Sequence, residues 1–95
     1  MSWRVIYHEA VAVDLQTIGQ AGARIILNVI TKRIQNGQPD KLGKTLTGRL
    51  AGYRRIRTGS MRIVYCVNAD ATEVLIVAIG QRRDSEVYAT AEKRT

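Results

Sequence analysis

Residues 73–79 (EVLIVAI) form an almost continuously apolar run. A strand of this kind is typical of the centre of a sheet, where other layers cover both of its faces. Two further strand-like runs precede it, at about residues 52–58 and 61–68, and the segment NADAT before it is a turn signal. The second half of the chain therefore predicts neighbouring strands of one sheet.

The first half of the chain predicts one strand followed by two helices. Residues 2–8 (SWRVIYH) alternate between two sides, as an edge strand does. The next apolar residues have the wider spacing of a short amphipathic helix that ends near Gly19. A second helix is expected over residues 21–36, because Gly37 and Pro39 then end it. Its predicted buried stripe consists of Ile26, Leu27, Ile30 and Ile34.

The order of these elements predicts an α+β fold, in which two N-terminal helices pack on one face of a small, mostly antiparallel sheet of four strands. The 95 residues are enough for one domain, and no repeat or low-complexity segment divides them. No apolar run approaches the roughly eighteen residues that a membrane-spanning helix needs. The first residues do not have the pattern of a signal peptide. We therefore expect a single domain over residues 1–95 and no membrane partner.

The single cysteine, Cys66, cannot form an internal disulfide and lies in an apolar strand-like run. It is expected to be a buried, reduced thiol, as in a cytoplasmic protein. Cysteine and histidine do not have the spacing of metal ligands. We therefore expect a cytoplasmic protein that uses no metal or other cofactor.

The formal net charge of +7 permits a nucleic-acid partner, an anionic membrane or an acidic protein partner. The distribution of the charge is more informative, because no Asp or Glu occurs between residues 41 and 65. An ordinary solvated face mixes both signs, so this stretch favours a binding site for a polyanion. Its seven cations are Lys41, Lys44, Arg49, Arg54, Arg55, Arg57 and Arg62.

The segment GYRRIRTGSMRIVY, residues 52–65, predicts a hairpin with its turn at TGS, where glycine is free to adopt a positive φ. For any loop with an even number of residues, Arg62 lies on the same face as Arg55 and Arg57. Arg54 and Ile56 then point to the other face. An odd-length turn or a bulge would break this inference. Like charges so close together destabilise a sheet, unless the face is open to water and meets phosphate when it works.

The segment IGQRRDSEVYATAEKR, residues 79–94, places two arginines and a tyrosine directly after the apolar strand. Irregular segments just past a sheet often carry function, because a rigid scaffold positions them. A purely structural interpretation remains equally open. In that case the segment is a polar tail that contains a frayed helix, and Tyr88 packs back on the sheet as an anchor.

The ordered combination of L-x-G-Y-R-R-I-R-T-G-S-M-R-I-V-Y and I-G-Q-R-R-D-S-E-V-Y resembles the RelE/ParE toxin superfamily, and within it the RelE branch. The resemblance extends over essentially the whole chain. It implies a RelE-like microbial ribonuclease fold and a bacterial or archaeal toxin that is encoded beside a small antitoxin. RelE-type toxins enter the ribosomal A site and cut the mRNA there without a metal. The ribose 2′-hydroxyl attacks the adjacent phosphate, which leaves a 2′,3′-cyclic phosphate and a 5′-hydroxyl.

The resemblance also places the family's functional residues on this chain. The basic positions of its first hairpin strand fall on Arg55 and Arg57, and the arginine of its second hairpin strand falls on Arg62. The arginine and the tyrosine that follow its last strand fall on Arg82 and Tyr88. Arg62 and Arg82 are expected to hold the charge of the reacting phosphate, because a guanidinium fork matches phosphate oxygens. The wider RNA-binding set is expected to consist of Arg54, Arg55, Arg57, Lys44, Arg49 and Arg83.

Tyr88 is expected either to accept the 2′ proton or to stack on a base of the mRNA. Some RelE relatives carry lysines on the first basic strand, where this chain has arginines. Arginine is not deprotonated in proteins, so the arginines of that strand are limited to electrostatic and positioning roles. The remaining candidates for the base are His8 and Glu86, which are better explained as a surface or helix-start residue and as an acid in a first helical turn.

A second function remains possible for this fold. ParE-type toxins are non-enzymatic binders that poison DNA gyrase, and an inactive copy of a toxin is a lesser alternative. The co-occurrence of Arg55, Arg57, Arg62, Arg82 and Tyr88 favours the ribonuclease, since a gyrase binder needs no phosphate clamp beside a tyrosine. In either case the resemblance implies a cognate antitoxin, whose acidic, partly helical segment is expected to lie over the helix pair and the sheet edge.

Overall fold

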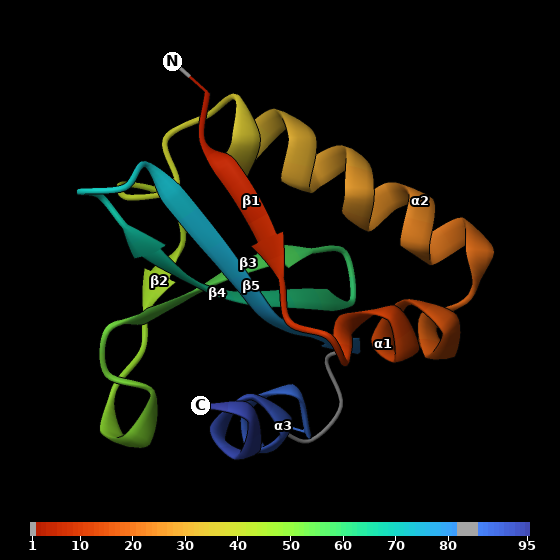
Figure 1. The fold of residues 1–95 in the computed structure, drawn as a ribbon. Helices are drawn as coiled ribbons and strands as arrows, with labels where there is room; N and C mark the ends of the chain where they lie inside the picture. Colours follow the sequence, from red (N-terminus) through yellow and green to blue (C-terminus); the bar gives the residue numbers. More distant parts are fainter. Residues whose placement is uncertain (1, 82–85) are drawn as a thin grey trace.

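The computed structural model describes residues 2–81 and 86–95. Its elements, in chain order, are β1 (Arg4–Tyr7), α1 (Val11–Ile18), α2 (Gln20–Val29), the π-helical η1 (Ile30–Gln35), β2 (Lys44–Thr45), the 3-10 helix η2 (Gly48–Leu50), β3 (Tyr53–Thr58), β4 (Met61–Asn68), β5 (Glu73–Gln81) and α3 (Glu86–Arg94). The five strands form one sheet in the order β1-β5-β4-β3-β2. Helices α1 and α2 cover one face of this sheet, and α3 covers the other (Figure 1).

The pairing of the strands confirms the expected α+β class. β1 pairs with β5 in parallel, and the other pairings are antiparallel. β5 lies between β1 and β4, as its apolar sequence predicts, and β1 is an edge strand. The sheet has one strand more than expected, because Lys44–Thr45 pairs with Arg54 and Arg55 of β3. A strand of two residues is too short to produce an alternating pattern, so the sequence does not reveal it.

The helices lie close to their expected bounds, and η1 continues α2 as far as Gln35. Ile26, Ile30 and Ile34 recur every four residues and are buried against the sheet. The prediction that Leu27 belongs to the same stripe is wrong, because 41% of this residue is exposed. One residue further along a helix is a rotation of about 100° around its axis, which places Leu27 at the margin of the buried stripe. Within the described ranges, no helix is long and apolar enough to cross a membrane.

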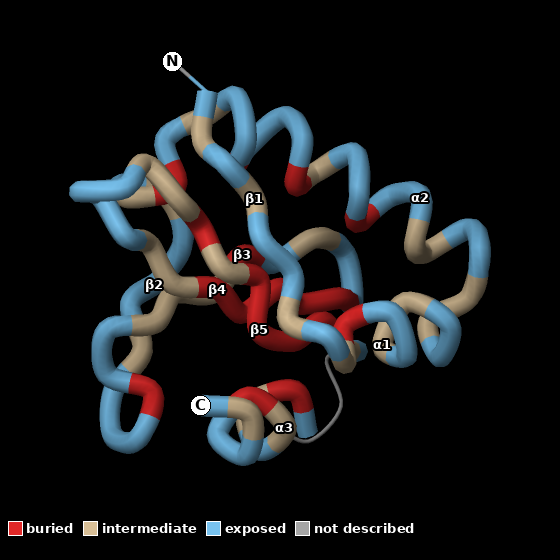
Figure 2. Tube along the Cα trace, in the orientation of Figure 1, coloured by how far each residue is buried: buried red, intermediate tan, exposed pale blue. Residues whose placement is uncertain are grey.

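Alternate residues of β4 point into two separate apolar layers. Ile63 and Tyr65 contribute to the layer beneath α1 and α2, whereas Val64 contributes to the layer beneath α3. Figure 2 shows the buried residues concentrated in the sheet, with the outer surfaces of α1 and α2 exposed. The chain therefore has one larger core and a smaller second core on the opposite face. The smaller core consists of Leu50, Val64, Val77, Ala78, Val87 and Ala91.

A β-bulge interrupts the regular pairing of β4 with β5. Val64 pairs with Ala78, but the next residue of β4, Tyr65, pairs with Ile76, so Val77 is an extra residue in β5. Val77 and Ala78 consequently both pack in the layer of α3. Two successive side chains of β5 therefore face the same side, and the regular alternation of side chains between the two faces resumes after them. The bulge thereby decides which residues near the end of the strand face α3.

Cys66 is a free thiol in β4 and is only partly buried. The thiol is free, as expected, but the expectation that it is buried is wrong. Its partial burial raises the pKa of the thiol. A raised pKa disfavours the reactive thiolate near neutral pH.

Candidate functional site

A tight hairpin joins β3 to β4 and decides which arginines share a face. The loop contains two residues, and the first of them, Gly59, has a φ of +59°. Arg57 lies directly opposite Arg62 across the two strands. Arg55, two residues before Arg57, points to the same side. The prediction that these three arginines share one face of the sheet is therefore confirmed.

Arg62 is nevertheless buried, with 9% of the residue exposed. A face open to water, which would make the crowded charge tolerable, is therefore not found at this position. Arg62 pairs with Gly80 of β5, and a Cβ atom at Gly80 would lie 3.1 Å from the Cβ atom of Val87. The missing side chain at Gly80 thus allows α3 to approach the sheet beside Arg62. Arg57, by contrast, is exposed.

Arg55 and Tyr88 meet between the sheet and α3. The Nη1 atom of Arg55 donates a hydrogen bond of 3.0 Å to the Oη atom of Tyr88. Tyr88 also packs against the smaller core, so the tail does fold back on the sheet. The Nε atom of Arg55 is buried and has no hydrogen-bond partner within residues 2–81 and 86–95. A buried unpaired N–H costs about 1–3 kcal/mol, so this position lowers the stability of the fold.

Further cations surround this contact. Lys44 of β2 pairs with Arg55, which places both on the same face, and Lys44 is exposed. Arg49 is exposed on η2, next to Leu50, which is buried in the layer of α3. Like charges that lie directly opposite each other destabilise a sheet. The pairs Lys44–Arg55 and Arg57–Arg62 are therefore easier to explain by an anionic ligand than by stability.

Arg54 lies on the opposite face, apart from the other arginines of β3. Its Nη1 atom donates a hydrogen bond of 3.0 Å to the carbonyl oxygen of Leu42. The hydroxyl of Tyr65 lies 2.9 Å from the carbonyl oxygen of Pro39 and 3.1 Å from that of Leu42, and can donate to either. Burial raises the pKa of Tyr65 to about 12, which keeps this donor protonated. These contacts hold the segment that leads into Lys44, and Arg54 therefore has a structural role.

Gly43 allows this segment to pass close to β3, and its replacement tests the packing. Its φ is +73°, and a Cβ atom would lie 2.8 Å from the backbone oxygen of Arg55 and 2.9 Å from the Oη atom of Tyr65. We expect Gly43→Ala to lower the free energy of unfolding by about 2–5 kcal/mol, from backbone strain and overpacking together. Gly48→Ala is the matched control, because Gly48 has a φ of +64° and nothing within 4 Å of the added atom. Denaturant unfolding measures both variants, and equal losses would contradict the predicted clash.

The other predicted site residues lie elsewhere. Arg82 and Arg83 lie outside the described residues. Glu86 is exposed in the first turn of α3, as expected. The Nδ1 atom of His8 accepts a hydrogen bond of 3.1 Å from the backbone N–H of Ala10, just before α1, which confirms its helix-start role. Within the described part of the chain, no three His, Cys, Asp or Glu side chains are grouped so that they could hold a metal ion.

An ion pair that the sequence analysis missed joins α1 to α3. The two guanidinium nitrogens of Arg94 lie 2.7 and 2.9 Å from the two carboxylate oxygens of Asp14. The side chains are 14% and 11% exposed, respectively. The hydrogen bond from Arg94 to Asp14 raises the pKa of the arginine. The partners are 80 positions apart, and the sequence around Arg94 is that of a polar tail, so no local pattern indicates the pair.

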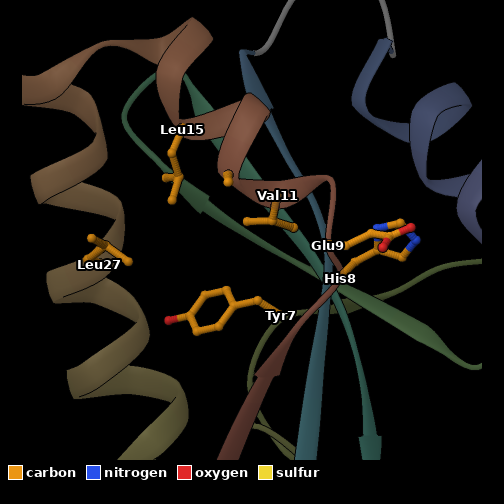
Figure 3. Close-up of a pocket in the computed structure, with 7 residues that line it drawn as sticks. Tyr7, His8, Glu9, Val11, Leu15 and Leu27 are labelled. Carbon is orange, nitrogen blue, oxygen red and sulfur yellow. The ribbon is translucent and has the colours of Figure 1, made fainter.

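An apolar groove lies between the edge strand β1 and the two N-terminal helices (Figure 3). Its volume is about 390 Å³. Tyr7 on β1 and Leu27 on α2 point toward each other across it and are 42% and 41% exposed. The groove therefore presents apolar surface beside an open sheet edge. It is lined by Tyr7, His8, Glu9, Val11, Ala12, Leu15 and Leu27.

Solved structures of toxins have the same fold. The RelBE2 toxin–antitoxin complex of Mycobacterium tuberculosis matches with a TM-score of 0.79 and 22% identity, over 86% of this chain and 100% of that chain. A double mutant of E. coli RelE in the free state matches with a TM-score of 0.77 and 21% identity, over 99% and 98% of the two chains. The archaeal RelE–RelB complex of Pyrococcus horikoshii matches with a TM-score of 0.62 and 26% identity, over 87% and 98%.

A family model supplies the classification. Among curated protein sequences, none matches this chain. The model described as "ParE toxin of type II toxin-antitoxin system, parDE" matches residues 5–86, from β1 to the start of α3. The expected RelE/ParE superfamily is thereby confirmed. The chain belongs to the ParE toxin family of type II toxin-antitoxin systems.

Proposed function

We propose that the chain is a toxin that cuts mRNA in the ribosomal A site, as a metal-independent endoribonuclease of the cytoplasm. The observation that carries the proposal is the 3.0 Å contact between Arg55 and Tyr88, on a face that also holds Lys44, Arg57 and Arg62. Cleavage of RNA by its own 2′-hydroxyl needs a group that takes a proton and cations that hold the charge of the reacting phosphate. The contact brings a phenolic hydroxyl and a guanidinium together.

Each residue has a role in the proposed reaction. The 2′ oxygen forms a bond to the adjacent phosphorus, and the bond from that phosphorus to the 5′ oxygen breaks. Tyr88 first releases its own phenolic proton to solvent and then takes the 2′ proton, while Arg55 holds the phenolic oxygen through its Nη1 atom. Water supplies the proton that the departing 5′ oxygen needs. Arg62 and Arg82 stabilise the charge on the pentacovalent phosphorus.

The remaining cations bind phosphates on either side of the cut. Lys44, Arg49 and Arg57 are exposed, and we propose that they and Arg83 contact the backbone of the mRNA or of ribosomal RNA. Arg54 is left out of this set, because its guanidinium is engaged with the carbonyl oxygen of Leu42. Such phosphate contacts position the RNA and make its binding depend on salt.

Poisoning of DNA gyrase is the second candidate function. The observation in its favour is the family model itself, since it describes a ParE toxin and extends from β1 into α3. Non-enzymatic binding does not require the Arg55–Tyr88 contact, whereas RNA cleavage does. The two candidate functions therefore differ in whether they need Arg55 and Tyr88 on this face.

Cleavage of mRNA on programmed ribosomes tests the proposal directly. We expect purified toxin to cut mRNA at the A-site codon, with 2′,3′-cyclic phosphate ends, and to arrest protein synthesis early after its induction in cells. DNA damage and filamentation with intact mRNA would instead support gyrase poisoning. Because both readouts use the unmodified chain, they do not depend on any assignment of residues.

We also propose that a cognate antitoxin docks in the apolar groove. Two of the similar solved structures, from M. tuberculosis and P. horikoshii, are toxin–antitoxin complexes. This chain has a net charge of +7 that an acidic antitoxin segment would complement. Tyr7 and Leu27 expose apolar surface beside the open edge of β1. An amphipathic, acidic segment would complement both the positive charge of the chain and the apolar surface of the groove.

Two substitutions on α2 test this docking site. Leu27→Asp puts a charge into the groove and is expected to weaken antitoxin binding by about tenfold or more, because an unpaired charge is costly to bury. Ile25→Asp is the control, since Ile25 is 50% exposed on the same helix and does not line the groove. Calorimetry with the antitoxin measures both affinities. Unchanged affinity of the Leu27 variant would place the antitoxin elsewhere.

A further inference from the structure

We propose that Asp14 and Arg94 are positioning residues for Tyr88. Their ion pair fixes how α3 lies on the sheet, and α3 in turn holds Tyr88 at Arg55. The inference rests on the proposed function for its catalytic readout. Neither Asp14 nor Arg94 belongs to the arginine face, so an effect of these residues on RNA cleavage has to be indirect.

The ion pair closes an open edge of the sheet. β1 pairs with β5 only as far as Ile76, so the end of β5 has no outer neighbour strand among the described residues. At this edge the Oδ2 atom of Asp14 accepts a hydrogen bond of 3.0 Å from the backbone N–H of Ile79. The Nη1 atom of Arg94 donates one of 3.0 Å to the carbonyl oxygen of Val77. The pair thus satisfies backbone groups that a neighbouring strand would otherwise satisfy.

The attachment of α3 to the sheet depends on this pair. A helix of nine residues is marginal by itself, and the buried residues of α3 are the small Val87 and Ala91. Arg94 follows at the i+7 position and lies on the same face of the helix. Tyr88 is rotated from Val87 by about 100° and reaches across to β3. Without the ion pair, the rotation and the axial position of α3 are set by two small apolar side chains and by the contacts of Tyr88 itself.

Hydrogen exchange of backbone amides tests the structural half of the inference. Asp14→Asn removes the charge with almost no change of shape, and Arg94→Gln removes the guanidinium. We expect either change to speed exchange in α3 by about tenfold or more, with β4 unaffected, because α3 becomes a separate unit of low stability. Glu92→Gln is the matched control, since Glu92 is an exposed acid on the same helix. Exchange in α3 at the wild-type rate in both variants would overturn the inference.

A double-mutant cycle on programmed ribosomes tests the functional half. We expect Asp14→Asn to lower kcat by between about tenfold and a hundredfold, as small misplacements of a reacting group do, with little change in KM. In the Tyr88→Phe background the same change should have an effect of less than about twofold, because the positioned hydroxyl is already gone. A purely structural role would instead lower kcat by the same factor in both backgrounds, and that result would overturn the inference.

The two halves separate a failure of the inference from a failure of the proposed function. If the wild-type protein does not cut mRNA, the proposed function is wrong, and the exchange of α3 amides decides the inference. Faster exchange in Asp14→Asn and Arg94→Gln, together with shifted ring signals of Tyr88 in NMR spectra, then supports it. Wild-type exchange and unshifted signals overturn it.

Discussion

Replacing Tyr88 with phenylalanine is expected to lower single-turnover cleavage of mRNA on the ribosome by about a hundredfold or more, the usual range for loss of a general base. The ring and its packing on the smaller core are kept, so the variant should fold normally. The hydroxyl that accepts the 3.0 Å hydrogen bond from Arg55 is removed. Cleavage assays and thermal melts of Tyr88→Phe and Tyr88→Ala measure both effects.

The same assays distinguish two other roles of this side chain. If Tyr88 only stacks on a base, phenylalanine works nearly as well, because stacking is worth about 1–3 kcal/mol per base and needs no hydroxyl. If it is only a packing anchor, Phe is harmless and Ala lowers the melting temperature. Tyr53→Phe is the matched control, since Tyr53 packs against the same core. Near-normal cleavage by Tyr88→Phe would show that the assignment of a proton-transfer role is wrong.

Replacing Arg62 with alanine is expected to lower cleavage by about a hundred- to a thousandfold, as does loss of one donor that stabilises a transition-state charge. The sequence alone suggests that folding should be nearly unaffected, because crowded charge is relieved. The burial of Arg62 changes that expectation, since a buried arginine also contributes through the packing of its stem. We therefore expect Arg62→Ala to lower the melting temperature as well.

Two further variants separate chemistry from stability at Arg62. Arg62→Lys keeps a positive charge and part of the stem but loses the planar fork. We expect it to fold better than the alanine variant and still to cut mRNA poorly. Arg24→Ala removes an exposed arginine from α2 and should leave cleavage and melting temperature unchanged. Wild-type cleavage by Arg62→Ala at equal expression would remove this residue from the active site.

The features that the sequence predicted correctly depend on short-range geometry. Arg55, Arg57 and Arg62 share a face because the loop of the hairpin has an even number of residues. The segment TGS does not fix that number, so the prediction is conditional on it. Ile26, Ile30 and Ile34 are buried because their spacing matches one side of a helix. The wrong prediction for Leu27 also comes from helical spacing. Leu27 is apolar and is the neighbour of Ile26, so it fits the apolar pattern, but it lies at the margin of the buried stripe.

The features that the sequence did not reveal depend on contacts between distant segments. The burial of Arg62 follows from the approach of α3, which Gly80 permits through its missing side chain. In the sequence, Gly80 is only the end of a strand. Asp14 and Arg94 are each ordinary polar positions in their own helices, and only the path of the chain around the edge of β5 brings them together.

The bulge at Val77 decides which residue of β5 lies opposite Arg62. If Val77 paired regularly with Val64, every later residue of β5 would move by one position, so that Ile79 would lie opposite Arg62 and face α3, and Gly80 would face the N-terminal helices. Each side chain would remain acceptable for a strand, and the sheet could still form. However, the gap through which α3 reaches Arg62 would close. A related chain that keeps this strand length but loses the bulge would therefore retain the scaffold without this face.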